Sequence, residues 1–392
     1  MTTTSTQVAI IGAGPAGLAL ASKLDRLGID NVVIERRSQE YVLARIRAGI
    51  LEQTTVDFLK DIGAAGRLEQ EGIPHHGVRL AYNNRIIPVG LGANTGGKVV
   101  TAYGQTEVTK DLCDLRAASP NPTIYEAENV SLHDFDSARP YVLYDEQGVT
   151  KRLNCQLIAG CDGYHGVSRV SVPESAITTY EKVYPFGWLG MLADVPPVSP
   201  EVLYANARRG FALCSMRSWT RSRYYIQCDP DDKVENWTDD MFWDELKRRL
   251  PDEVSDNIQT GPSLEKSIAP LRSFIAEPLR FGRLLLAGDA AHVVPPTGAK
   301  GLNLAFSDVH YMSEAIETFT SDGHEDALSR YSERALARVW KTQRFSWYLT
   351  NLTHRFSDDP FDQRVKEAEL AYVTTSQAGL QMIAENYVGM PL

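Results

Sequence analysis

The sequence of 392 residues lacks several features that would assign it to a familiar class. Its five cysteines form no C-x-x-C pair and their number is odd, which argues against a disulfide framework and a thiolate metal site. We therefore expect reduced thiols, a cytoplasmic protein and no bound metal. The first ten residues lack the charged and apolar regions of a signal peptide, and no apolar run approaches the ~20 residues that cross a bilayer, so no membrane association is predicted.

An excess of positive charge is also missing. The chain has 40 Lys and Arg against 50 Asp and Glu, and its formal net charge is −10. This balance argues against nucleic-acid binding, because that affinity depends on neutralising phosphates. With 43% hydrophobic and 23% charged residues, the composition is that of a globular protein. The length predicts two or three structural units rather than one small core.

The chain opens with a pattern typical of nucleotide binding. An apolar run at residues 8–11 precedes Gly12, Gly14 and Gly17, and an amphipathic segment then leads to a second apolar run that ends in Glu35. Gly12 permits a tight turn, Gly14 lets the backbone approach a pyrophosphate, and Gly17 allows close packing of helix and strand. Glu35 is placed to accept hydrogen bonds from a ribose. The pattern predicts a dinucleotide site but does not distinguish NAD from FAD.

Two further apolar runs end in a Gly/Asp pair. Residues 282–305 (GRLLLAGDAAHVVPPTGAKGLNLA) pass from a buried strand into Gly288-Asp289 and a turn rich in Pro and Gly, with a helix expected to begin near Gly298. Residues 157–169 (LIAGCDGYHGVSR) repeat the theme with Asp162-Gly163. A carboxylate beside a free helix N-terminus suits a flavin, whose pyrimidine end becomes negative on reduction. The three segments together predict FAD.

These motifs resemble those of the single-component FAD-dependent aromatic hydroxylases. Seven other segments resemble more specifically the hydroxylases that act on 4-hydroxybenzoate. These segments are RIRAGILEQ (45–53), YGQTEVT (103–109), YPFGWLG (184–190), RGFALCSMRS (209–218), RSRYY (221–225), SLEKSIAPLRSF (263–274) and AENYVG (384–389). The resemblance covers nearly the whole chain. It implies a flavin monooxygenase that uses NADPH or NADH and O₂ to convert 4-hydroxybenzoate to 3,4-dihydroxybenzoate through an FAD C4a-hydroperoxide.

The resemblance also implies an architecture of the α/β class. A Rossmann-like FAD-binding domain of the aromatic hydroxylase type would accompany a β-sheet substrate domain and C-terminal helices. We assign residues 1–178 to the FAD-binding domain, completed by 272–309, residues 179–271 to the substrate domain and residues 310–392 to the C-terminal helical region.

The C-terminal region is aromatic on one helical face. This face favours a homodimer interface, with a core within one chain as the alternative. The residues concerned are Trp340, Phe345, Trp347 and Tyr348.

Matched residue by residue, the resemblance implies two nucleotide sites. The expected FAD contacts are Gly12, Gly14, Ala16, Gly17, Glu35, Arg45, Ile46, Arg47, Ala48, Gly49, Ile50, Gln105, Asp289, Gly298, Leu302 and Asn303. The nicotinamide cosubstrate would lie in a surface cleft formed by Arg36, Arg37, Tyr41, Arg47, His165, Arg169 and Arg272. Two successive arginines after Glu35 suit a 2′-phosphate, which favours NADPH and leaves NADH open.

The same resemblance implies how an aromatic acid would be held. Arg217 would bind the carboxylate bidentately, with hydroxyl groups of Ser215 and Tyr225 as further donors. Hydroxylation beside a phenol requires the phenolate, so a relay would carry the proton to solvent. The expected catalytic residues are Tyr204, Tyr387, His75 and Pro296, and the expected substrate contacts are Tyr204, Ser215, Met216, Arg217, Tyr225, Pro296 and Thr297. Lys300 would raise the local positive potential.

Two other functions remain open. The same chemistry on another hydroxy- or aminobenzoate is one, although Arg217 and Tyr204 at opposite ends of the substrate argue for a para-phenol. The other is an FAD protein that binds its ligand without hydroxylating it. The tyrosine pair argues against that alternative, because binding alone needs no proton path.

Overall fold

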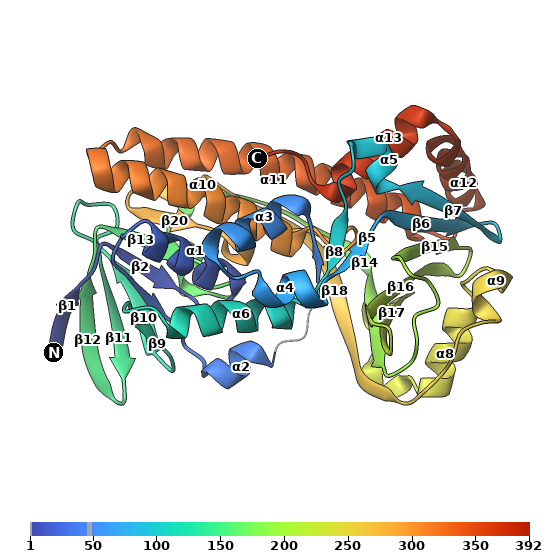
Figure 1. Cartoon of the computed structure of the whole chain (residues 1–392), viewed down its shortest axis with the longest axis horizontal. Helices are drawn as coiled ribbons and strands as arrows, with labels where there is room; N and C mark the ends of the chain where they lie inside the picture. The colour runs from blue at the N-terminus through green and yellow to red at the C-terminus, as the bar shows by residue number, and fades with distance from the viewer. Residues whose placement is uncertain (1, 45–48) are drawn as a thin grey trace.

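The computed structural model describes residues 2–44 and 49–392, which fold into two halves side by side along the long axis (Figure 1). Two long strands, β14 (Thr178–Ala193) and β18 (Ser263–Glu277), pair antiparallel and run between the halves. Helices of the C-terminal part lie along one side of both halves (Figure 1).

A mostly parallel sheet of six strands forms the first half. Its order is β19-β20-β13-β2-β3-β9, and all neighbours except β19 and β20 are parallel. Every residue of β2, β3, β13 and β20 is buried, as expected for a parallel sheet covered on both faces. The strands are β2 (Val8–Ile11), β3 (Asn31–Ile34), β9 (Thr123–Ile124), β13 (Leu157–Gly160), β19 (Arg280–Phe281) and β20 (Leu284–Leu286).

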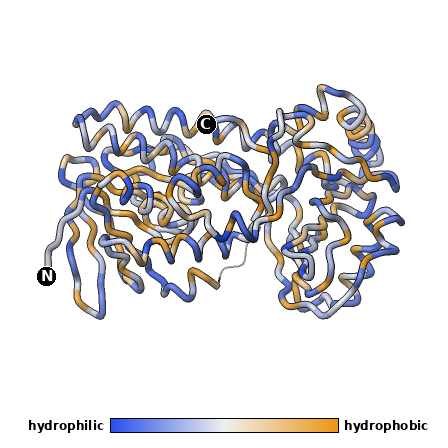
Figure 2. Tube along the Cα trace, viewed as in Figure 1, coloured by the Kyte–Doolittle hydropathy of each residue, from blue (hydrophilic) through white to orange (hydrophobic). Residues whose placement is uncertain are grey.

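Helices cover this sheet because their apolar faces match its buried strands. The first helix, α1 (Pro15–Arg26), contacts both α6 (Gln105–Ala117) and α10 (Gly301–Asp322) and buries its leucines and alanines. Figure 2 shows the apolar residues concentrated along the central strands, with polar residues on the outer turns of the helices.

The second half is built on a sheet of eight strands with two different faces. Its order is β21-β18-β14-β17-β16-β15-β6-β7. Because side chains alternate along a strand, Leu189, Tyr224 and Cys214 pack on one face in a cluster that includes residues of α8 (Asp239–Lys247). The opposite face carries Trp188, Phe211 and Tyr204. The remaining strands are β6 (Gly77–Tyr82), β7 (Arg85–Gly90), β15 (Leu203–Ala207), β16 (Gly210–Ser218), β17 (Arg221–Cys228) and β21 (His292–Val293).

Two smaller sheets and several short helices complete the described residues. One sheet joins β1 (Thr2–Ser5), β12 (Val149–Asn154), β11 (Tyr141–Glu146) and β10 (Glu128–His133), and the other joins β4 (Ile50–Leu51), β8 (Val100–Ala102) and β5 (Ile73–His75). The short helices are α2 (Gln39–Leu43), α3 (Gln53–Ile62), α4 (Gly66–Glu71), α5 (Leu91–Thr95), α7 (Val167–Val170), α9 (Asp252–Ser255), η1 (Glu174–Ala176), η2 (Val234–Asn236) and η3 (Gly288–Ala290).

The C-terminal helices are α11 (Asp326–Thr353), α12 (Pro360–Thr375) and α13 (Gln377–Val388). Phe345 is 1% exposed within the chain, so this residue belongs to a core within one chain rather than to an exposed interface. Trp340 and Trp347 remain 41% and 43% exposed, which the core interpretation does not explain. Within the described residues, no helix is both long and apolar enough to cross a bilayer.

The predicted α/β fold is confirmed, and the buried strands at residues 8–11, 31–34, 157–160 and 284–286 lie where the sequence placed them. The expected helix start near Gly298 is wrong by three residues, since α10 begins at Gly301. Gly298 and Ala299 have φ values of 88° and 55°, left-handed conformations that cannot belong to a right-handed helix. The division of the chain into three regions stays a prediction.

Candidate active site

The three predicted nucleotide segments meet at one edge of the parallel sheet. They follow β2, β13 and β20, which are adjacent and parallel, so their carboxyl ends lie together. The geometry of the three glycines is compatible with the roles expected of them. Gly12 has a φ of 103°, a Cβ on Gly17 would lie 2.0 Å from the Gly12 oxygen, and a Cβ on Gly14 would meet nothing within 4 Å. The backbone at Gly14 is therefore open to a ligand.

Glu35 ties the ends of β2 and β3 together. Its Oε2 accepts from the Ala13 N–H at 2.8 Å and its Oε1 from the Arg37 N–H at 2.9 Å. The side chain is thereby fixed beside the glycine turn, where a ribose would lie.

A second carboxylate at this edge has a free oxygen. Asp162 Oδ2 accepts from the N–H and hydroxyl of Ser168 at 2.8 and 3.0 Å, whereas buried Oδ1 has no hydrogen-bond partner among the described residues. Burial is the main effect on the pKa of Asp162 and raises it. A buried unpaired carboxylate oxygen is costly unless a ligand donates to it, so this edge fits a polar ligand such as FAD.

Behind Gly288-Asp289, a buried ion pair holds the loop in place. Asp308 Oδ2 on α10 accepts from the Gly288 N–H at 2.9 Å and lies 2.6 Å from His292 Nε2. The pKa of His292 is raised by Asp308 against the opposing effect of burial. Gly288 itself packs against Ala16, since a Cβ there would lie 3.5 Å from the Ala16 Cβ.

Asn303 connects the turn at residues 298–301 to the first half of the chain. Its Oδ1 accepts from the Glu52 N–H and the Thr55 hydroxyl, both at 2.8 Å, and its Nδ2 donates to the carbonyls of Ile50 and Ala299. The side-chain amide of Asn303 thus makes all its hydrogen bonds within the protein. Its predicted contact with FAD would therefore have to come from the backbone N–H of Asn303.

The other predicted FAD contacts surround this edge or fall outside the described residues. Gly49 lies against the residue that follows β8, since a Cβ there would be 2.0 Å from the Tyr103 oxygen, and Gln105 is the first residue of α6. Ile50 is buried and Leu302 is partly buried. Arg45, Ile46, Arg47 and Ala48 lie outside the described residues.

Two tyrosines from distant elements meet on the second sheet. The hydroxyl groups of Tyr204 on β15 and Tyr387 on α13 are 3.1 Å apart, and the Gly298 N–H donates to the Tyr204 hydroxyl at 3.2 Å. Burial raises the pKa of Tyr204 to about 12, while its hydrogen bonds with Tyr387 and Gly298 act in the opposite direction. The Tyr204 oxygen therefore accepts from the backbone, and its one proton is left for Tyr387 or a ligand.

Arg217 on β16 lies partly buried and forms no ion pair with a carboxylate in the described part of the chain. Its Nη1 donates to the Ser215 hydroxyl at 3.3 Å and to the Met216 carbonyl at 3.5 Å, and its buried Nε has no hydrogen-bond partner among the described residues. Burial is the largest effect on the pKa of Arg217 and lowers it, whereas the nearby Tyr225, which shares a hydrogen bond with it, raises it. An unpaired guanidinium of this kind suits an incoming carboxylate.

Arg223, which is not among the predicted site residues, belongs to the same cluster. It is 5% exposed, pairs with Glu265 at 3.1 Å, and lowers the pKa of Arg217 by charge repulsion. Two guanidinium groups therefore face one carboxylate here. The alternation of charged and apolar residues in RSRYY could have indicated that Arg223 and Tyr225 share a face.

His75 forms no hydrogen bond with either tyrosine in the described structure. It is 1% exposed, and neither ring nitrogen has a hydrogen-bond partner among the described residues. Burial lowers its pKa to about 4. Proton exchange with solvent through His75 stays a prediction.

The turn before α10 presents its polar groups in two directions. Pro296 is exposed and its carbonyl accepts from the Ala299 N–H at 2.9 Å. The buried Thr297 hydroxyl accepts from the Thr350 hydroxyl at 2.9 Å and keeps its own proton to donate, and its contact with a substrate stays a prediction.

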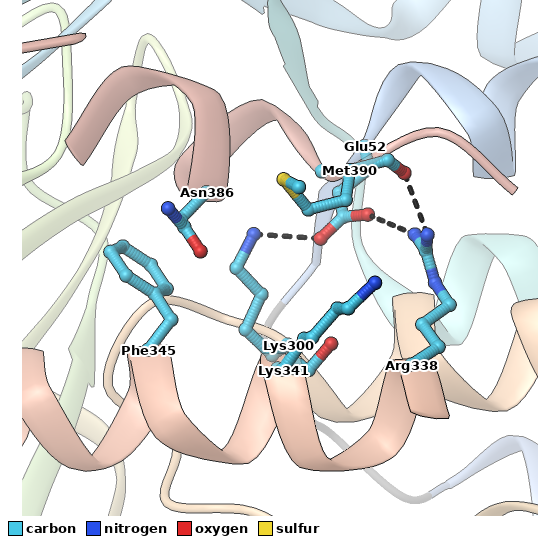
Figure 3. A pocket seen from close by; sticks show the side chains of 9 residues that line it. Glu52, Lys300, Arg338, Lys341, Phe345, Asn386 and Met390 are labelled. Carbon is cyan, nitrogen blue, oxygen red and sulfur yellow. Dashed lines mark hydrogen bonds and ion pairs between the residues drawn. The ribbon is translucent and has the colours of Figure 1, made fainter. Parts of the chain in front are cut away.

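Lys300 belongs to a buried group of charged side chains that lies beside the last residues of the chain. Its Nζ donates to Glu52 Oε1 and to the Tyr387 carbonyl, both at 2.7 Å, and the second Glu52 oxygen lies 3.3 Å from Arg338 (Figure 3). Two cations thus share one carboxylate. The small pocket around them is lined by Glu52, Lys300, Arg338, Lys341, Thr342, Phe345, Asn386, Gly389 and Met390.

The predicted nicotinamide contacts fall into two groups near the same sheet edge. Arg36, Arg37 and Tyr41 follow β3 and are exposed, with the Arg37 guanidinium 5.1 Å from the Tyr41 ring centre. In the second group, Arg169 and Arg272 lie 4.7 and 4.9 Å from the ring centre of Tyr164, and His165 packs edge-on against that ring. Arg47 lies outside the described residues.

In sequence and in fold, the chain is similar to FAD-binding proteins and to monooxygenases. Residues 5–346 match a family model described as an FAD binding domain. The chain is 56% identical over 392 residues to p-hydroxybenzoate hydroxylase of Acinetobacter baylyi, covering 100% of this chain and 97% of that protein. It is 25% identical to para-nitrophenol 4-monooxygenase of a Pseudomonas species over 83% of this chain and 81% of that protein. The crystal structure of p-nitrophenol 4-monooxygenase from Pseudomonas putida superposes with a TM-score of 0.82 at 18% identity over the full length of both chains.

Replacement of Gly17 by alanine tests the glycine turn. Its Cβ would fall 2.0 Å from a backbone oxygen that cannot move aside. We expect the Gly17→Ala variant to lose about 1–3 kcal/mol of stability and most of its bound FAD. Gly66→Ala is the matched control, since a Cβ there meets nothing within 4 Å. Thermal unfolding and the flavin content of the purified protein measure both effects, and full FAD retention in Gly17→Ala would contradict this account of the turn.

Proposed function

The chain belongs to the FAD-dependent aromatic hydroxylases, the family of p-hydroxybenzoate hydroxylase, and we propose that it converts 4-hydroxybenzoate to 3,4-dihydroxybenzoate with NADPH and O₂. The overall reaction consumes one NADPH, one O₂ and one proton and releases NADP⁺ and water. The substrate assignment rests on two groups that suit the two ends of 4-hydroxybenzoate and lie on the same sheet. Arg217 offers an unpaired guanidinium and Tyr204 a hydroxyl, on adjacent strands of one sheet.

The carboxylate end of the substrate would bind at Arg217. Ser215 and Tyr225 add hydroxyl groups beside it, and Arg223, which pairs with Glu265, supplies a second positive charge. A benzoate completes this arrangement, because it brings a negative charge and a planar pair of oxygens to a partly buried cation.

The phenol end would meet Tyr204. Since the Tyr204 oxygen accepts from the Gly298 N–H, the Tyr204 O–H can donate to the substrate phenolate, and the 3.1 Å contact gives the displaced proton a path to Tyr387. The excess positive charge of Lys300 and Arg338 over Glu52 favours the phenolate. We propose that His75 exchanges this proton with solvent.

FAD supplies the oxygen chemistry when it is bound and reduced by the nicotinamide. The chain's part is to hold it with the glycine turn, Glu35 and the Gly288-Asp289 loop at one edge of the sheet. We propose that NADPH contacts Arg36, Arg37 and Tyr41 together with His165, Arg169 and Arg272, of which the arginines suit a 2′-phosphate.

We also propose a cytoplasmic homodimer. All five cysteines are unpaired and buried, which suits a reducing compartment. The exposed Trp340 and Trp347 on α11 suit an interface between copies. Sedimentation of the FAD-loaded protein tests the dimer, and a monomer at micromolar concentration would rule it out.

The function is tested by NADPH oxidation with the purified FAD-loaded protein. We expect fast oxidation only with 4-hydroxybenzoate present, with 3,4-dihydroxybenzoate formed in equal amount. NADH, 3-hydroxybenzoate and 4-aminobenzoate are assayed in parallel. Fast oxidation that releases only peroxide would mean that the acid is an effector, and no stimulation by any of these acids would leave an FAD-binding protein without this substrate.

Replacement of Arg217 by lysine tests the carboxylate site. Lysine keeps the charge but loses the planar fork, so we expect the dissociation constant for 4-hydroxybenzoate to rise about 100-fold. Arg221→Lys is the matched control, because Arg221 is on neighbouring β17, is exposed, and pairs with Asp194. The change in flavin absorbance on ligand addition measures binding, and equal affinity of the Arg217→Lys variant and the wild type would remove Arg217 from the site.

A further inference from the structure

A buried histidine outside the predicted site forms a short hydrogen bond with a strand of the eight-stranded sheet. His354 follows the last turn of α11 and is 0% exposed. Its Nε2 lies 2.6 Å from Trp188 Nε1 on β14, and its Nδ1 lies 3.0 Å from the Thr350 carbonyl and from the Thr353 hydroxyl.

These partners fix the protonation of the ring. The indole N–H can only donate and the Thr350 carbonyl can only accept, so Nε2 carries the lone pair and Nδ1 carries the proton. Burial lowers the pKa of His354 to about 3, which keeps the imidazole neutral over the physiological range. The imidazole is also stacked on Phe211 at 4.0 Å and on Phe186 at 4.8 Å between ring centres.

Trp188 in turn forms one wall of the Tyr225 position. The two ring centres are 5.0 Å apart, and on the other side the Arg223 guanidinium lies 5.3 Å from the Tyr225 ring. Below the Tyr225 ring is Gly190, where a Cβ would fall 2.7 Å from Tyr225 Cε1. Tyr225 therefore lies in a slot whose floor and two sides are fixed.

Side chains of the same sheet face hold this end of α11 in place. Asn206 Nδ2 donates to the Thr353 carbonyl at 3.2 Å, and Gln227 Nε2 donates to the Arg355 carbonyl at 2.6 Å while its Oε1 accepts from the Arg355 N–H at 3.0 Å. His354 thus has a fixed position relative to β14, β15 and β17.

We propose that His354 is a positioning residue for the carboxylate end of the substrate site. Its neutral ring accepts from the Trp188 indole and holds that indole against Tyr225, whose hydroxyl supports Arg217. The inference rests on the proposed function. It assigns a specificity role to a histidine that touches neither end of the substrate.

The test separates the hydrogen bond from simple packing. His354→Phe keeps a flat ring between Phe186 and Phe211 but removes the acceptor, and Trp188→Phe keeps a ring but removes the donor. We expect each variant to bind 4-hydroxybenzoate about 10-fold more weakly, with the KM for NADPH unchanged. The double variant should be no weaker than the weaker single variant, since both lose the same bond.

The control is His133→Phe, because His133 also stacks on a ring, that of Tyr141, but belongs to the separate sheet of β10 and β11. In the wild type, the ¹H–¹⁵N signal of the Trp188 indole should be displaced relative to His354→Phe. Wild-type affinity in His354→Phe, or losses that add in the double variant, would overturn the proposal. If His354→Phe does not fold, unchanged affinity in Trp188→Phe overturns it. Failure of the wild type to bind the acid would instead refute the proposed function.

Discussion

A single backbone N–H, that of Gly298, donates to the Tyr204 hydroxyl at 3.2 Å and joins the turn after the parallel sheet to the sheet that carries the acid site. Gly298 can present its N–H there because its φ of 88° reverses the chain just before α10 begins. The turn is held from behind by Asn303, whose amide bonds to Glu52, Thr55, Ile50 and Ala299. The turn at the FAD edge is therefore joined directly to the phenol site by a hydrogen bond.

Charge is distributed around this contact in a consistent way. At one end, Arg217 and Arg223 face Glu265, and at the other, Lys300 and Arg338 face Glu52. Each group holds one more cation than anion in a buried or partly buried setting, which is costly until a negative ligand arrives. A substrate that ionises at both ends, as benzoate and as phenolate, balances the two groups together.

The nucleotide edge could be read from the sequence because its constraints are local. Gly12 and Gly17 are required by a turn and a close contact within six residues, and the strand pattern fixes which edge they occupy. Local pattern could place Arg223 on the face of Tyr225, but the roles of Arg223 and His354 could not be found in this way. Their roles depend on contacts with Glu265 on β18 and Trp188 on β14, which only the folded sheets bring together. Asn303 was found by resemblance, but its hydrogen bonds to residues about 250 positions away were not predictable.

The Tyr204 hydroxyl, held by Gly298, should favour the ionised phenol of the bound acid. The most direct measurement is the pKa of enzyme-bound 4-hydroxybenzoate, followed by its absorbance across pH, in the wild type and in Tyr204→Phe, with Tyr144→Phe as a control for loss of a buried hydroxyl. The account predicts a bound pKa below that of the free phenol in the wild type and in the control, and a clearly higher value in Tyr204→Phe. The same bound pKa in Tyr204→Phe and the wild type would contradict it.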